Sequence, residues 1–110
     1  MAQAIVIHGA FEDTPHTVAM VEVGERTGSD ALEYAYRRTQ NIEGSWSKGP
    51  VIEWDGEEHD NGDYSDDITV MAPLHKEGDR EYGLRSTSVG DHILFGTVKY
   101  RVANFGFEEL

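Results

Sequence analysis

The segment from Glu53 to Asp67 holds the densest group of ionisable side chains in this sequence. Its fifteen residues include eight carboxylates and no lysine or arginine, namely Glu53, Asp55, Glu57, Glu58, Asp60, Asp63, Asp66 and Asp67. They account for eight of the twelve charges in the formal net charge of −12. Clustered carboxylates can bind a hard cation such as calcium. They can also offer a basic protein the dense negative charge of a nucleic-acid backbone.

The calcium interpretation lacks the spacing of an EF-hand. That loop needs glycine at its sixth position and acidic residues at the first, third and fifth. With Gly62 in the sixth place, those positions hold Glu57, His59 and Asn61. A looser calcium site stays open, as does a solvated acidic loop that serves solubility. We take the eight carboxylates as a predicted partner-binding site, and we expect the basic surface of a nucleic-acid-binding protein as the partner.

Other residue groups indicate chemistry less specifically. Imidazole and carboxylate ligands for zinc or iron could come from His8, Glu12, Asp13 and His16, but their spacing matches no known signature. Residues 45–49 fall one residue short of the nucleophile elbow of α/β-hydrolases, and this chain is too short for that fold. We therefore expect no catalytic residues, no metal ligands and no cofactor. The protein is predicted not to be an enzyme, and a small metal-dependent enzyme is the least favoured alternative.

A weak base-stacking patch is a further alternative. Its members would be Tyr34, Arg37, Arg38 and Trp46, since single-stranded nucleic-acid binders place aromatic rings beside cations. The net charge of −12 opposes this role, because a negatively charged protein is repelled by nucleic acid and by anionic membranes. We expect no direct binding of either.

Length and composition favour one α+β domain over residues 1–110. The chain contains no cysteine, so it can form neither disulfides nor thiolate metal sites. It also lacks a run of about 18 apolar residues and a signal-peptide pattern, which predicts a cytoplasmic location. We expect a small, mainly antiparallel sheet or a partly closed barrel, with strands at 3–8, 17–23 and 68–71.

One amphipathic helix is predicted at about residues 30–40. Asp30 is expected to cap it, with Glu33 completing a capping box. An apolar face is formed by Ala31, Leu32, Ala35 and Tyr36. We expect Asn41 to end the helix in a left-handed conformation.

A C-terminal hairpin at residues 92–104 is the firmest local prediction. Gly96 and Thr97 separate two apolar segments, as in a type II′ turn. This register sets Phe95 opposite Val98 and Ile93 opposite Tyr100 on the core face.

The connecting segments contain both turn residues and large apolar residues. Trp46 is expected to pin its loop to the core, because so large an apolar side chain is costly to expose. Asn61-Gly62 predicts a turn, and residues 74–83 read as a polar loop. Phe105 and Phe107 are expected to enter the core or to follow a sheet edge.

Two stretches of the sequence resemble a group of small bacteriophage proteins without assigned activity. The resemblance covers residues 29–47 and 84–110 and rests on Thr39–Ser47 (TQNIEGSWS), Leu84–Asp91 (LRSTSVGD) and Tyr100–Phe107 (YRVANFGF). It implies an accessory protein that binds and modulates or inhibits a host protein, and some such proteins imitate nucleic acid. A structural or assembly module that self-associates is the alternative expectation.

Overall fold

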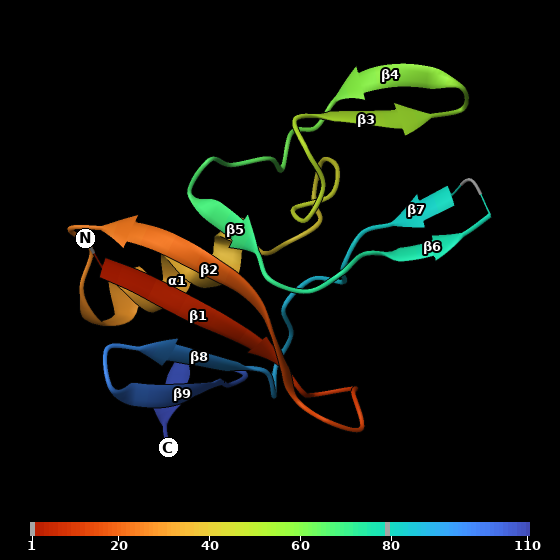
Figure 1. Ribbon diagram of the computed structural model, residues 1–110. Helices are drawn as coiled ribbons and strands as arrows, with labels where there is room; N and C mark the ends of the chain where they lie inside the picture. Colours follow the sequence, from red (N-terminus) through yellow and green to blue (C-terminus); the bar gives the residue numbers. More distant parts are fainter. Residues whose placement is uncertain (1, 79) are drawn as a thin grey trace.

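A six-stranded antiparallel sheet with one helix against its face forms the body of the protein. The computed structural model describes residues 2–78 and 80–110. Its elements are β1 (Ala2–His8), β2 (His16–Gly24), α1 (Gly28–Arg38), β3 (Val51–Trp54), β4 (Glu57–Asp60), β5 (Ile68–Val70), β6 (His75–Glu77), β7 (Arg80–Tyr82), β8 (His92–Phe95), β9 (Val98–Val102) and β10 (Phe107–Glu109). The sheet has the order β10-β9-β8-β1-β2-β5 (Figure 1). The fold is therefore α+β.

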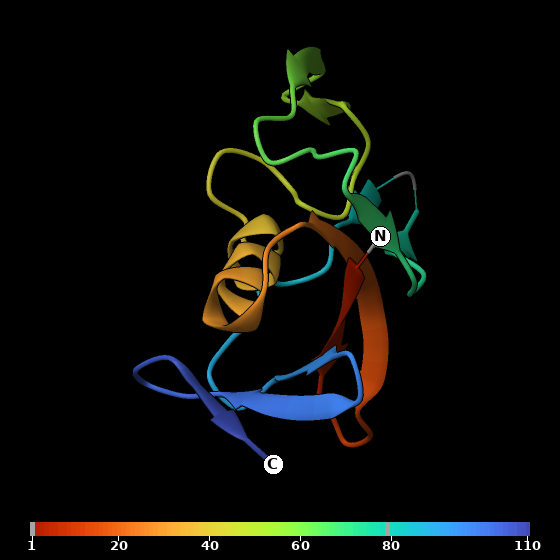
Figure 2. The same cartoon turned by 90° about the vertical axis from the view of Figure 1, so that its left-hand side faces the viewer.

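The sheet is open. Its outer strands β10 and β5 pair only with β9 and β2 within the described residues, so the alternative of a partly closed barrel is not formed. Figure 2 shows α1 lying against one face of the sheet. The described part of the chain includes no helix that is long and apolar enough to cross a membrane.

The core lies between α1 and the sheet. Ala4 and Val6 of β1 are fully buried, because alternate residues of a strand point to the same face. From the helix, Ala31, Leu32 and Ala35 are buried as the sequence predicts. Each buried valine or leucine contributes about 1.5–3 kcal/mol relative to an exposed side chain.

The ends of α1 differ from the sequence prediction. Thr27 is the N-cap residue and makes no side-chain cap bond, while Asp30 lies inside the first turn. The predicted capping box is therefore wrong, and Glu33 accepts a hydrogen bond of 2.7 Å from Arg37 instead. At the other end, Asn41 does not adopt a left-handed conformation. Thr39 is the C-cap residue instead, and its hydroxyl donates to the Ala35 carbonyl of the last turn at 2.9 Å.

The pairing of β8 with β9 has the register that the sequence predicts. Phe95 lies opposite Val98 and Ile93 opposite Tyr100. Gly96 has φ 65, as the first position of a type II′ turn requires. The second strand ends at Val102, whereas the predicted hairpin runs to residue 104.

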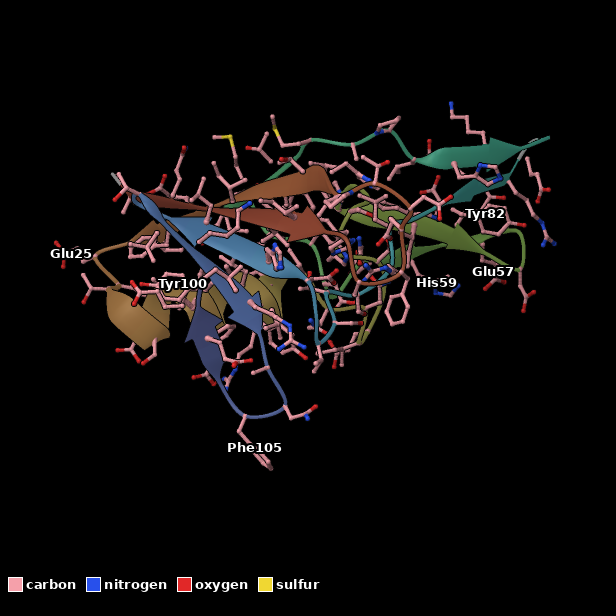
Figure 3. The ribbon with its side chains drawn as sticks, turned by 90° about the horizontal axis from the view of Figure 1, so that it is seen from below. Glu25, Glu57, His59, Tyr82, Tyr100 and Phe105 are labelled. Carbon is pink, nitrogen blue, oxygen red and sulfur yellow. The ribbon has the colours of Figure 1, made fainter. Side chains whose placement is uncertain are left out.

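The two C-terminal phenylalanines lie in different environments. Phe107 packs edge-on against Tyr36 with ring centroids 6.3 Å apart. Phe105 is 96% exposed at the tip of the β9–β10 loop, so its predicted place in the core or along an edge is wrong (Figure 3).

Two short hairpins project from the body toward one end of the molecule, β3 with β4 and β6 with β7 (Figure 1). The second occupies the segment that the sequence indicates to be a polar loop, so that prediction is wrong. Gly78, with φ 62, supplies the positive φ that a tight hairpin turn needs despite the low apolar content of the strands. The first begins two residues before the acidic segment and ends inside it, although the charge of that segment does not indicate a hairpin.

Candidate protein-binding surface

The acidic segment has two parts: most of a projecting hairpin, and residues 61–67, which hold that hairpin and which we call the base. We call residues 51–60 the acidic arm. Its strands β3 and β4 are joined by Asp55-Gly56, whose φ values of 54 and 78 are those of a type I′ turn. Asp-Gly is one of the pairs that favour this turn, because both positions need a positive φ. The local turn chemistry therefore folds the arm despite its charge.

Carboxylates gather on one face of the acidic arm. Glu53 lies directly opposite Glu58, and Val51 lies opposite Asp60, so these four residues share a face. Like charges in directly opposite positions destabilise a strand pair. All five carboxylates of the arm are exposed, namely Glu53, Asp55, Glu57, Glu58 and Asp60. The hairpin therefore carries a surface that costs it stability.

Asn61 fixes the end of the arm to the preceding loop. Its side chain is almost fully buried, with 6% of the residue exposed. The amide donates to the Ser45 carbonyl at 2.6 Å and to the Gly49 carbonyl at 2.8 Å. Its oxygen accepts the Ser45 N–H at 3.0 Å. A Cβ on Gly44 would come 2.2 Å from that oxygen, so the close approach requires glycine there. A turn follows, with Tyr64 N–H bonded to the Asn61 carbonyl at 3.1 Å, as Asn61-Gly62 predicts.

Three of the eight predicted carboxylates lie in the base and already have partners. Asp63 accepts three backbone N–H groups, from Ile42 at 2.7 Å, Glu43 at 3.0 Å and Gly44 at 2.8 Å. Asp67 accepts the hydroxyl of Tyr34, and Asp66 accepts that of Tyr64 at 2.6 Å. Burial, followed by the bond to Asp67, raises the pKa of Tyr34. Asp63 and Asp67 form a structural clamp, whereas Asp66 is exposed and bonds a hydroxyl only two residues away. The five arm carboxylates form the main surface open to a partner.

Trp46 attaches the same loop to the body. The residue is 1% exposed, and its indole N–H donates to the Arg85 carbonyl at 2.9 Å. Its ring meets His8 edge-on with centroids 6.3 Å apart. The prediction that Trp46 pins the loop is confirmed. Its burial also removes it from the predicted base-stacking patch, in which Tyr34 instead has Arg26 above its ring at 3.7 Å.

The segments at 39–47 and 84–91, which carry two of the motifs, bond to each other. Asn41 donates its backbone N–H to the Ser86 hydroxyl at 2.8 Å and its amide to the Leu84 carbonyl at 2.9 Å. The Leu84 N–H donates to the Ser47 hydroxyl at 2.7 Å. Residues 39–47 and 84–91 therefore form a hydrogen-bonded region, which we call the joint, and this region holds loops against the sheet. Sequence reasoning found their resemblance but not their contact.

Asp91 is the centre of that joint. It is fully buried and accepts the backbone N–H groups of Gly9, Ala10 and Ser88 at 2.8–3.0 Å. The guanidinium of Arg85 bonds both of its oxygens, at 2.7 and 2.8 Å. Arg85 also reaches Glu12 at 2.8 and 3.0 Å. One arginine thus joins the β1–β2 loop to the turn before β8.

The protonation of these groups follows from their contacts. Burial by itself would raise the pKa of Asp91, but the Arg85 guanidinium and the three backbone N–H groups outweigh it and hold that pKa well below its usual range. The bond from Arg85 likewise lowers the pKa of Glu12. Burial lowers the pKa of His8, although the nearby Asp91 carboxylate opposes this shift. The joint therefore holds two carboxylates ionised.

The possible metal ligands near the N-terminus do not form a common site. His8 is buried, and its Nε2 lies 3.0 Å from the Thr87 hydroxyl, which contacts Thr39 at 2.7 Å. Glu12 is engaged by Arg85. Within residues 2–78 and 80–110, no three or more histidine, aspartate or glutamate side chains are grouped as metal ligands.

No protein-family model matches this sequence, and no curated protein or solved structure shows detectable similarity to the chain. Function is therefore inferred from the geometry of the exposed acidic arm, by contrast with the buried joint.

Proposed function

We propose that this is a small accessory protein of bacteriophage type that binds a host or phage protein through the acidic arm. The partner presents a basic surface, of the kind that nucleic-acid-handling proteins use for the phosphate backbone. Binding there modulates or inhibits the partner. The observation that carries the proposal is the set of five exposed carboxylates on a hairpin anchored by Asn61 and Asp63.

Anchoring matters because a nucleic-acid mimic needs its charges in fixed positions. A free acidic tail would pay conformational entropy on binding, whereas a hairpin has lost much of it on folding. Like-charge pairing of Glu53 with Glu58 costs the hairpin stability, and a cationic partner relieves that cost. Both features favour a binding role over solubility alone.

Affinity capture from host lysate with mass spectrometry tests the proposal. The arm variant combines Glu53→Gln, Glu58→Gln and Asp60→Asn on the acidic face. A matched control combines Glu25→Gln, Glu109→Gln and Asp13→Asn, which removes the same charges from exposed sites on the body. Figure 3 shows Glu25 at the opposite end of the molecule from Glu57. We expect a captured partner that the arm variant loses and the control keeps, with retention falling steeply as salt rises.

The base carboxylates are left intact in this design. Replacing Asp63 or Asp67 would remove the clamp as well as charge, so lost binding could then be a folding defect. Equal capture by the arm variant and the wild-type protein would exclude the acidic arm as the contact.

Self-association is a second candidate, favoured by the unpaired outer edges of β5 and β10 in the described part of the sheet. Open edges can pair with another copy of the same chain. A solution mass above that of one chain, with the acidic arm still reactive to carboxylate-modifying reagents, would support this function instead.

A further inference from the structure

A cleft of about 660 Å³ lies between the two projecting hairpins. Its wall on one side is β3 and the Asp55-Gly56 turn, and on the other side it is β7, with Lys48 and Gly49 completing the lining. No residue of β4 or β6 lines it. The outer edges of β3 and β7 therefore face each other across the cleft (Figure 1).

Both facing edges carry backbone groups without ladder partners. β3 pairs only with β4, and β7 only with β6, among the described residues. In a two-residue hairpin the pair that closes the turn exchanges both hydrogen bonds, and the next pair along exchanges none. Trp54 and Glu57 close the first hairpin, so Glu53 directs its N–H and C=O into the cleft. Glu77 and Arg80 close the second, so Glu81 does the same.

We propose that an extended peptide segment of a partner protein binds in this cleft as an added strand between β3 and β7. It would hydrogen-bond to both edges and join the two hairpins into one sheet, a form of β-augmentation. This inference rests on the proposed function, since it assigns the form that the partner takes at the acidic arm.

The lining specifies the side chains of the bound segment. The charged lining consists of three carboxylates, Glu53, Asp55 and Glu81, and two cations, Lys48 and Arg80. Glu53 would lie beside every second residue of an added strand, and Glu58 lies one strand further away on the same face. Cationic side chains fit there. Apolar side chains also line the cleft: Ile52 lies on the opposite face of β3 from Glu53, and Tyr82 of β7 is 43% exposed. The fitting segment therefore alternates lysine or arginine with aliphatic residues.

A second copy of this chain is the less suitable occupant. Two molecules of formal net charge −12 repel each other, and each would bring further carboxylates to the acidic face. A cationic strand is attracted to the same surface. Charge complementarity therefore selects a basic partner segment.

The probe is a synthetic peptide of about seven residues in which lysine and valine alternate, a length typical of a strand. Its control has the same sequence with N-methyl groups on alternate backbone amides, which removes donors and keeps every charge. Wild-type protein is titrated with both by calorimetry at fixed salt. We expect the unmethylated peptide to bind roughly tenfold or more tightly than the methylated one.

Paired variants distinguish the loss of a backbone N–H at the strand edge from the loss of a carboxylate charge. Glu53→Pro and Glu53→Gln both remove the carboxylate, but only proline removes the N–H that faces the cleft. Proline is tolerated at such a position, because that N–H is not used by the β3–β4 ladder. Glu81→Pro and Glu81→Gln form the same pair on β7. We expect each proline variant to bind the peptide roughly tenfold more weakly than its glutamine counterpart.

The variants at the two strand edges test different parts of the proposal. Proline and glutamine variants that bind equally at both sites would overturn the inserted strand, as would equal binding of the two peptides. An effect at Glu53 without one at Glu81 would overturn the bridging arrangement. These results leave the acidic arm as a charge-based contact, whereas unchanged capture by the arm variant described above refutes the proposed function itself. The peptide comparison uses folded wild-type protein, so a poorly folded proline variant does not decide the outcome.

Discussion

Asp91 and the acidic arm use the same chemical group in opposite ways. In the joint, one fully buried carboxylate is surrounded by three backbone N–H groups and a bidentate guanidinium. In the acidic arm, five exposed carboxylates face one another or solvent. The first arrangement stabilises the fold, and the second costs stability while leaving the charges accessible. A carboxylate whose oxygens accept hydrogen bonds within the protein is structural, and one without such donors is a candidate for binding. This distinction matters more than whether the residue lies in an acidic run.

The largest expected effect is at Asp91. Asp91→Ala leaves Arg85 and three N–H groups without their acceptor, so we expect the free energy of unfolding to fall by about 3–5 kcal/mol. Urea unfolding followed by circular dichroism measures it. Glu58→Ala in the acidic arm is the control and should change stability by no more than about 0.5 kcal/mol. A loss below about 1 kcal/mol at Asp91 would remove the contrast between the two regions.

The attachment of the arm comes next. Asn61→Ala removes a buried side-chain amide together with its three hydrogen bonds to the backbone of Ser45 and Gly49, which should cost about 2 kcal/mol in unfolding free energy. We also expect faster amide hydrogen exchange in residues 45–49 and in the acidic arm. Unchanged exchange there would mean that the arm is held by other contacts.

Lowering the pH should destabilise the joint. The pKa of His8 is lowered in the folded protein, so the unfolded chain binds more protons once pH falls below about 6.5. Stability should then decrease as pH falls from that value toward the folded pKa, by at most about 1.4 kcal/mol per pH unit. The contribution of Asp91 is complete above its unfolded pKa of about 3.9 and is lost as pH falls through its lower folded value. Unfolding free energies between pH 7.5 and pH 5, with His8→Gln as the comparison, isolate the histidine. A slope unchanged in that variant would contradict the assignment.

The smallest effect should have the opposite sign. Glu58→Gln removes a like charge opposite Glu53, so it should stabilise the acidic arm by a few tenths of a kcal/mol. Amide exchange within residues 51–60 should slow, whereas exchange in β1 and β8 should not change. Faster exchange in the arm would show that the repulsion is absent.

The sequence predicts the body better than it predicts the projecting hairpins. The β8–β9 register follows from a Gly-initiated turn and alternating apolar residues, two local signals that agree. The apolar face of α1 follows from helical periodicity, but its ends do not, because Thr39 bonds to Thr87 across the fold. Long-range contacts of this kind have no local signature.

The acidic segment shows where charge counts mislead. Eight carboxylates look equivalent in sequence, yet Asp63 lies where three N–H groups of residues 42–44 converge. Asp55-Gly56 is a strong hairpin signal that the surrounding charge obscured. The joint was missed because Glu12 and Arg85 lie 73 residues apart in the chain. Only the fold brings them together.

Hydrogen–deuterium exchange of the protein bound to its captured partner would locate the contact surface on this chain. We expect new protection in the acidic arm and in β7, with exchange at residues 85–91 of the joint unchanged and already slow. The protection should vanish in the variant that combines Glu53→Gln, Glu58→Gln and Asp60→Asn. Protection confined to the joint or to the edges of β5 and β10, with the acidic arm exchanging as in the free protein, would contradict the proposed contact.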